Sequence, residues 1–202
     1  MLIFWDQKLV FLATPKAGST AIETALEPLA SVSMQRPDVL KHMTAMDFQK
    51  HLKPYLCANS SSPFTTVALI RHPVEWLRSW YRFLLRDGFD LPDHPLHNRS
   101  FEEFALDYMQ APCPPHAKLQ KQSDFLTDTA GNLLVDRLYR YEDIGNFLQF
   151  LEDRLRFEIS LPRINVPPTV DTKLSAPVEA RLVAFMKDDF RLYDQALSSQ
   201  PN

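Results

Sequence analysis

The chain has 202 residues, of which 45% are hydrophobic and 23% are charged. These fractions are close to the averages for soluble globular proteins, so they exclude a disordered or fibrous chain and predict a single domain over residues 1–202. The 22 lysines and arginines against 25 aspartates and glutamates leave a net charge of −3. That charge excludes the broad basic surface on which nucleic acid or an anionic membrane binds, so any anion site must be local.

The cysteines and the apolar segments bear on the compartment of the protein. Cys57 and Cys113 are too few for the disulfide framework of a secreted protein. No apolar run reaches the roughly 20 residues that span a bilayer, and residues 1–6 lack the basic start of a signal peptide. We therefore expect a cytoplasmic protein without a transmembrane segment.

Residues 1–29 predict a strand, a loop and a helix in succession. Apolar stretches at 2–5 and 9–13 indicate a short hairpin or bent strand, whose buried part ends near Thr14. Residues 19–29 then place apolar side chains at helical spacing behind a serine and a threonine. A loop must therefore join the end of a buried strand to the start of a helix.

A second unit of the same kind begins at residues 65–70, a β-branched apolar run that is typical of a strand covered on both faces. Pro73 suits the first turn of a helix, and residues 74–85 are apolar at helical spacing. The rest of the chain predicts a helix at 100–109, a strand at 133–139, helices at 142–155 and 177–193, and loops at 90–98, 111–116 and 164–171.

The alternation of strands and helices predicts an α/β fold with three layers, αβα, around a mainly parallel central sheet. In such sheets, ligands bind beyond the carboxyl ends of the strands. The loops that follow residues 13 and 70 leave such ends, so both are candidate binding loops.

The first candidate loop reads Thr14-Pro15-Lys16-Ala17-Gly18-Ser19-Thr20. The N–H groups and the dipole at a helix start favour an anion, Gly18 allows the backbone to approach it closely, and Lys16 supplies a full positive charge. In a Walker A loop the lysine follows the last glycine, whereas here Lys16 precedes Gly18, so this is a different kind of loop. An ordinary turn with a capping serine or threonine is the alternative.

The second candidate loop, after residue 70, begins Arg71-His72-Pro73. Ser79 lies about two helical turns beyond Arg71, so a guanidinium and a hydroxyl can share one phosphate there. Arg78, Arg82 and Arg86 recur every four residues, which predicts a solvated or partner-facing stripe of the helix. We therefore place these three arginines outside the site.

Together the two loops resemble those of the sulfotransferases that use 3′-phosphoadenosine 5′-phosphosulfate (PAPS). Residues 15–20 are similar to the 5′-phosphosulfate loop of that family, and residues 71–81 are similar to its 3′-phosphate motif. The two motifs stand about 55 residues apart in the family's order. The segment from His42 to Phe48 is similar to the His-x-x-x-x-Asp-Phe segment of the glycan 2-O-sulfotransferase branch. Further likeness extends over 122–126, 139–143, Asn165 and 188–193.

The resemblance implies a P-loop-NTPase-like sulfotransferase fold, and transfer of a sulfuryl group from PAPS to the hydroxyl of a carbohydrate. The product PAP would leave, and no metal would be needed. Lys16 would neutralise the leaving phosphate and His42 would act as the general base. Because the chain is short and has no anchor or stem, we expect a bacterial relative. The cofactor-binding residues implied are Lys16, Ala17, Gly18, Ser19, Thr20, Arg71, Ser79 and Lys173.

Several alternatives stay open at this point. An ATP-dependent P-loop-like phosphotransferase would require magnesium, and a nucleotide-binding module without turnover would require no base. The sequence has no Cys/His cluster at zinc spacing and no carboxylate set suited to magnesium. The acceptor, the adenine contacts and the oligomeric state are open too. Other candidates for the general base are His51, His94, His97, His116 and Glu23.

Overall fold

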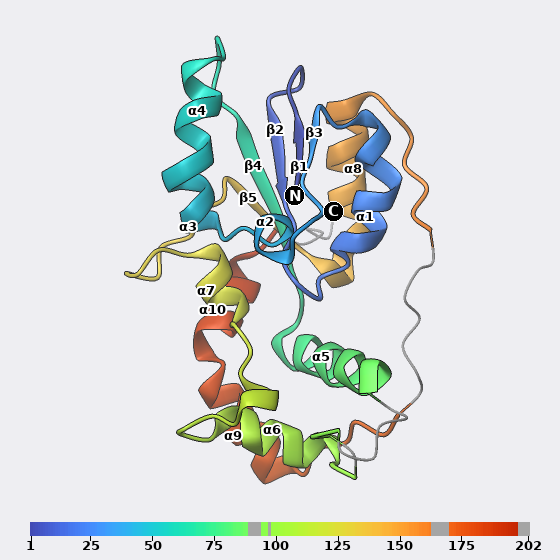
Figure 1. The fold of residues 1–202 in the computed structure, drawn as a ribbon, viewed down its shortest axis with the longest axis vertical. Helices are drawn as coiled ribbons and strands as arrows, with labels where there is room; N and C mark the ends of the chain where they lie inside the picture. Colours follow the sequence, from blue (N-terminus) through green and yellow to red (C-terminus); the bar gives the residue numbers. More distant parts are fainter. Residues whose placement is uncertain (89–93, 97, 163–169, 198–202) are drawn as a thin grey trace.

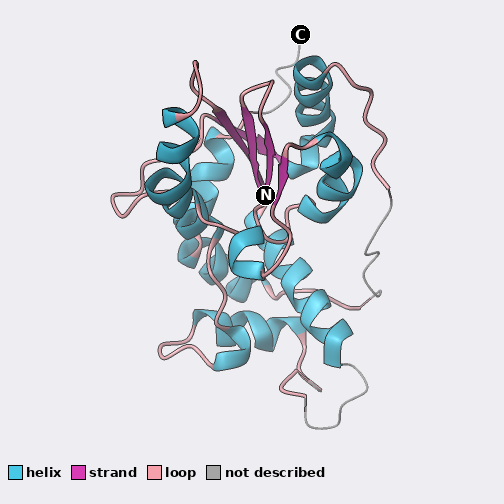
Figure 2. Cartoon of the chain, turned by 45° about the horizontal axis from the view of Figure 1, so that its top comes forward, coloured by secondary structure: helices cyan, strands magenta, loops and turns pink. Residues whose placement is uncertain are grey.

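The computed structural model describes residues 1–88, 94–96, 98–162 and 170–197, and it has an α/β fold. A five-stranded sheet stands between two groups of helices, and a further helical layer extends beyond one end of the sheet (Figure 1). The same view, tilted, shows the helices around the strands on both sides (Figure 2).

The sheet has the strand order β3-β1-β2-β4-β5. Strands β2 (Leu9–Leu12), β4 (Thr65–Ile70) and β5 (Arg137–Arg140) run parallel, whereas β1 (Leu2–Phe4) pairs antiparallel with β2 and with β3 (Val32–Ser33). The sheet is therefore mixed, with two parallel and two antiparallel pairings. The predicted mainly parallel arrangement describes only the half that contains β2, β4 and β5.

The antiparallel half follows from the hairpin that the sequence predicts at the N-terminus. Leu2 pairs with Phe11 and Phe4 with Leu9, so β1 folds straight back on β2. The turn ends at Lys8, whose φ of 51° lies in the left-handed region. The Lys8 ammonium lies 4.6 Å from the centre of the Trp5 ring, a cation–π contact that supports the turn.

One face of the sheet is covered by α1 (Ser19–Leu26) and α8 (Ile144–Leu155). Phe11 and Val67 of the strands pack with Phe147 of α8 in one buried apolar cluster. Burying such side chains stabilises the fold by about 1.5–3 kcal/mol each. The helices predicted at 19–29 and 142–155 are confirmed, each with one end tightened into a 3₁₀ turn, Glu27–Leu29 and Tyr141–Asp143.

The opposite face carries short helices that the sequence analysis did not predict. Phe48, Phe125 and Leu192 pack there against the strands in a second buried cluster. These helices are too short to show a helical period in the sequence, so only their tertiary contacts define them. The unpredicted elements of this side are α3 (Ala45–Asp47), the π turn Phe48–Leu52, α4 (Lys53–Ala58) and α7 (Gln122–Leu126). The longer α10 (Lys187–Gln195), which lies within the helix expected at 177–193, completes this side. α2 (Asp38–Lys41), also unpredicted, buries none of its residues.

The further helical layer lies beyond the end of β4 and consists of α5 (Pro73–Gly88), α6 (Phe101–Met109) and α9 (Ala176–Phe185) (Figure 1). Trp76 and Phe104 are buried at its centre. The helices predicted at 74–85 and 100–109 are confirmed. A 3₁₀ turn, Pro115–Ala117, follows α6.

Two predicted elements differ from the structure. The helix expected at 177–193 is broken at the fully buried Met186, which lets α9 pack on α6 while α10 packs on α7. The strand expected at 133–139 shortens to β5. The Asp136 carboxylate accepts hydrogen bonds from both the N–H and the hydroxyl of Thr66, which places the start of the parallel pairing there.

Two further expectations concern the membrane and the cysteines. Within the described ranges, none of the helices combines the length and the apolar character that a bilayer crossing requires. Cys57 is exposed, Cys113 is half-buried, and both are free thiols.

Asp189 is a fully buried carboxylate on α10. Its Oδ1 accepts a hydrogen bond of 2.6 Å from the N–H of Ser123, while Oδ2 has no hydrogen-bond partner among the described residues. Burial, only partly offset by the bonds from Ser123, raises the pKa of Asp189 to about 6 from 3.8. The folded protein therefore holds a proton that the unfolded chain releases, and the stability gained from it is present below about pH 4 and lost as the pH rises through 6.

Asp189→Asn should remove this pH dependence while it keeps an oxygen for the Ser123 N–H. We expect the variant to be more stable than the wild type by about 1–3 kcal/mol at pH 7.5, and equally stable at pH 4. Urea unfolding at the two pH values measures the difference. A stability gain of equal size at both would contradict a buried ionisation at this position.

Candidate functional site

The loop between β2 and α1 has an unusual backbone. Lys16 and Gly18 both have positive φ, 61° and 77°. A Cβ on Gly18 would lie 2.5 Å from Cε2 of Tyr141, so only glycine allows the ring to rest on the loop. Ala17 is buried in the cluster of the sheet and anchors the loop from beneath.

Two side chains from the second candidate loop and its helix hold the first loop in place. The indole Nε1 of Trp76 donates to the carbonyl of Pro15 at 3.1 Å. Nη1 of Arg71 donates to the carbonyl of Lys16 at 3.3 Å. The loop carbonyls therefore point to protein donors. α1 begins at Ser19 behind Gly18 and has no side-chain cap, which leaves its first N–H groups without a side-chain acceptor.

Arg71 stands at the carboxyl end of β4 and joins both loops. Besides its bond to Lys16, its guanidinium lies 4.9 Å from the centre of the Tyr141 ring, a cation–π contact. Its Nε is buried and has no hydrogen-bond partner among the described residues. The guanidinium is thus held on two sides and keeps a donor for an anion.

These loops open onto a cavity of about 790 Å³, a volume that suits a nucleotide-sized ligand. Its lining comes from the loop after β2, the start of α1, α2, the first residue after β4, α5, and the turn before α8 with the first residue of α8. Seven of the nine residues expected in the site line this cavity: Lys16, Gly18, Ser19, Thr20, His42, Arg71 and Ser79. Ala17 is buried beneath the loop and is not in the lining.

The wall formed by α5 contains two arginines that were expected to lie outside the site. Arg82 and Arg86 line the cavity with Ser79 and Phe83. Positions 79, 82, 83 and 86 are spaced i, i+3, i+4 and i+7, so they share one face of the helix. The expectation that these two arginines lie outside the site is therefore corrected. Ser79 was the signal that could have revealed them, because residues three, four and seven positions after it lie on the same face of the helix.

Arg78 is not among the described residues that line the cavity, which agrees with its expected place outside the site. Its Nη1 forms an ion pair with Glu75, and its Nε donates to the carbonyl of Thr172 at 3.2 Å. Arg82 reaches the hydroxyl of the same threonine at 3.2 Å. The segment around Thr172 is thus tied to α5 by two arginines.

Lys173 follows Thr172 but is not brought to the cavity. Its side chain is 90% exposed, and its Nζ lies 3.8 Å from the Asp171 carboxylate. It is absent from the residues that line the cavity in the described part of the chain. Its predicted contact with the 3′-phosphate therefore has no counterpart in the structure.

Lys16 turns toward an aromatic wall of the cavity. Its Nζ lies 2.9 Å from the centre of the Phe83 ring and 4.6 Å from the centre of the Trp80 ring. A cation over two ring faces is stabilised by their quadrupoles. The charge of Lys16 is thereby kept at the cavity wall.

His42 lies next to the end of β2. Its Nδ1 is 2.6 Å from the carbonyl oxygen of Ala13. A carbonyl only accepts hydrogen bonds, so Nδ1 must carry the proton, and in the neutral ring Nε2 is left as the acceptor. Burial lowers the pKa of His42 below 6.5, and the bond to Ala13 only partly offsets this. Near pH 7 the ring is a neutral base with a defined tautomer.

The carboxylate alternative to His42 is engaged elsewhere. Glu23 is buried, with Oε1 2.7 Å from the amine of Met1 and Oε2 3.3 Å from Nζ of Lys41. It lies behind the cavity wall rather than in the lining. Both of its oxygens therefore face cations of the fold, and the structure does not bring Glu23 to the cavity.

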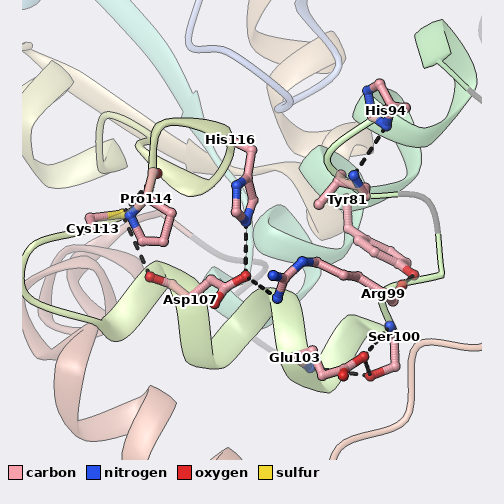
Figure 3. Close-up of polar contacts among 10 residues, drawn as sticks. Tyr81, His94, Arg99, Ser100, Glu103, Asp107, Cys113, Pro114 and His116 are labelled. Atoms are coloured by element: carbon pink, nitrogen blue, oxygen red, sulfur yellow. Dashed lines mark hydrogen bonds and ion pairs between the residues drawn. The ribbon is translucent and has the colours of Figure 1, made fainter. Parts of the chain in front are cut away.

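The other histidines of the described residues also stand away from the cavity lining. Nε2 of His116 is 2.8 Å from the Asp107 carboxylate of α6, which also binds Arg99, and Nδ1 of His94 accepts from a nearby backbone N–H (Figure 3). His51 is exposed on the π turn. His97 lies outside the described residues.

No family model matches the chain, and no curated protein shows significant sequence similarity to it. Among the described residues, no group of three or more His, Cys, Asp and Glu side chains could hold a metal ion.

The contact between Gly18 and Tyr141 yields a stability prediction. Gly18→Ala should lower the free energy of unfolding by about 1–3 kcal/mol, since the new methyl group combines positive φ with a clash. Gly145→Ala is the matched control, because a Cβ there meets no atom within 4 Å. Thermal unfolding of both variants measures the difference. Equal melting temperatures would refute the close approach.

Proposed function

We propose that the chain is a PAPS-dependent sulfotransferase that transfers a sulfuryl group to a hydroxyl acceptor, with a carbohydrate as the expected acceptor. The observation that carries this proposal is the convergence of Lys16, Arg71, Ser79 and His42 on one cavity. Two anion-binding loops and a neutral base are what a bisphosphorylated nucleotide and a hydroxyl require.

The parallel half of the sheet supports a P-loop-like sulfotransferase fold. The loops after β2 and β4 leave neighbouring parallel strands at the same edge, where α/β sheets bind nucleotides. The loop before Ser19 differs from a Walker A loop in the order of its lysine and glycine. This difference favours a sulfuryl donor over ATP.

The two ends of the donor have separate partners in this proposal. The first N–H groups of α1, at Ser19 and Thr20, would hold the 5′-phosphosulfate. Arg71 and Ser79 would hold the 3′-phosphate. PAPS fits this site because the first turn of α1 has no side-chain cap and Nε of Arg71 has no hydrogen-bond partner among the described residues.

In-line transfer then assigns a task to each reacting group. The acceptor oxygen forms a bond to sulfur while the bond from sulfur to the 5′-phosphate oxygen breaks, and charge develops on the departing phosphate. Lys16 stabilises this charge once its ammonium leaves the ring of Phe83. Nε2 of His42 takes the proton of the acceptor hydroxyl.

Nucleotide binding tests the donor. The wild type should bind PAP more tightly than ADP, or than ATP with magnesium, because only PAP carries a 3′-phosphate. Arg71→Ala should weaken PAP binding about 10- to 100-fold, as expected for the loss of a charged hydrogen-bond partner. Calorimetric titration measures both effects.

Arg181→Ala, an exposed arginine on α9, is the control for this titration. Its affinity for PAP should equal that of the wild type. Tighter binding of ATP with magnesium than of PAP would contradict the proposed sulfotransferase activity and favour a phosphotransferase.

The tautomer and the pKa of His42 yield a kinetic prediction. Because burial lowers the pKa of His42, the transfer rate should begin to fall, as the ring gains a proton, at a lower pH than a histidine with the ordinary pKa of 6.5 would give. His42→Ala should reduce the rate about 100- to 10,000-fold. Initial rates of transfer from radiolabelled PAPS to an acceptor found in a carbohydrate screen measure this.

His116→Ala is the control for the base, because Asp107 holds that ring outside the cavity lining. It should keep the wild-type rate and pH profile. If His42→Ala kept its activity while His116→Ala lost it, the base would be misassigned.

A further inference from the structure

Gln122, which does not line the cavity, makes a pair of hydrogen bonds with the backbone of Arg71. Its side chain is nearly fully buried at the start of α7. The N–H of Arg71 donates to Oε1 at 2.9 Å, and Nε2 donates to the carbonyl of Arg71 at 2.8 Å. One side-chain amide thus pairs both backbone groups of a single residue 51 positions away.

This pairing stands where the sheet ends. Ile70 is the last residue of β4 and is the register partner of Arg140 in β5. Arg71 is the first residue beyond that ladder, so its backbone groups need another partner. Gln122 takes the place that a neighbouring strand would occupy. The next N–H, of His72, donates to Oε1 of Glu142 at 3.0 Å.

The chemistry of the pairing restricts the residue type. A primary amide offers a donor and an acceptor side by side, as a peptide group does. A carboxylate has no donor, and an apolar side chain has neither. At this position a glutamine therefore satisfies both backbone groups of Arg71, which a side chain chosen for packing alone would not do.

The position of Gln122 is itself fixed from the other side of the fold. The next residue, Ser123, donates its N–H to the buried carboxylate of Asp189 on α10. α7 and α10 pack against each other in this region. Hydrogen bonds thereby connect the backbone of Arg71, through α7, to α10 in the group of helices that covers this face of the sheet.

We propose that Gln122 is a positioning residue that aims the guanidinium of Arg71 at the 3′-phosphate of the nucleotide. The inference rests on the proposed function. Gln122 does not line the cavity, so it acts only through Arg71. Because a two-donor contact of a guanidinium with a phosphate depends on orientation, a small displacement of the Arg71 backbone weakens it.

The test compares PAP with AMP, which differ only in the 3′-phosphate. Gln122→Met keeps the length of the side chain and removes both hydrogen bonds, whereas Gln122→Glu removes only the donor. In both variants PAP should bind about 10-fold more weakly, while the affinity for AMP should change less than about 2-fold. Gln149→Met, an exposed glutamine on α8, should leave both affinities unchanged.

A double-mutant cycle separates positioning from general destabilisation. If Gln122 acts through Arg71, Gln122→Met should weaken PAP binding no further in an Arg71→Ala background. Melting temperatures identify a variant that fails to fold, and the cycle is then run with Gln122→Glu. An equal loss of PAP and AMP affinity, or additive effects with Arg71→Ala, would overturn the proposal.

The two proposals fail in different ways. If the wild type binds PAP and AMP equally, the 3′-phosphate site is absent and the proposed function fails. If the wild type prefers PAP and Arg71→Ala abolishes that preference, but both Gln122 variants retain it, only the positioning role is overturned.

Discussion

The parallel pairing of β2 with β4 is the constraint on which the site depends. It places the ends of two strands, and the loops that follow them, at one edge of the sheet although they are about 55 residues apart in the chain. Arg71 then bridges the two loops through the carbonyl of Lys16 and the ring of Tyr141. Without that alignment the same residues would form two unrelated turns, each of a common kind.

The cavity concentrates positive charge in a protein of net charge −3. Lys16, Arg71, Arg82 and Arg86 all line it, and the aromatic rings of Trp80 and Phe83 form part of the wall. Low-dielectric walls strengthen the field of such charges, so a small basic cavity can bind a strongly anionic ligand without a basic surface around it. Among the described lining residues, five lysines and arginines stand against one carboxylate, that of Asp38, so the excess of positive charge is local to the cavity.

The polar contacts around Arg71 link this cavity to the whole fold. Gln122 and Glu142 pair the backbone of the turn after β4, and Asp189 holds the helix that carries Gln122. Each is a side chain that completes hydrogen bonding where a strand or helix stops. Buried backbone groups must find partners, so the ends of secondary structure are where polar side chains come under the strictest geometric demands. The site and the most constrained polar contacts therefore lie in the same region.

Much of this arrangement was present in the sequence. The β-branched run at residues 65–70, the paired loops and the periodicity of α5 and α8 depend on local preferences, and local preferences can be inferred without a structure. The same holds for Lys16, Arg71 and Ser79, whose residue types and spacing point to anions. The short helices at 38–58 could not be inferred, because helices of three to six residues show no period and exist only through tertiary packing.

The remaining features were decided by tertiary structure. Glu23 and His116 were alternative candidates to His42 for the base, yet Glu23 pairs with the amine of Met1 and His116 contacts the Asp107 carboxylate. The carbonyl of Ala13 instead fixes the tautomer of His42. The place of Arg82 in the cavity depends on which face of α5 meets the loops. The residues alone indicated the hairpin of β1 and β2, the strand β4, the helices α1, α5, α6 and α8, and the chemical character of the two loops, because these follow from neighbouring residues. Which side chains meet in the cavity depends on contacts between residues far apart in the chain, and those contacts exist only once the sheet has aligned its strands.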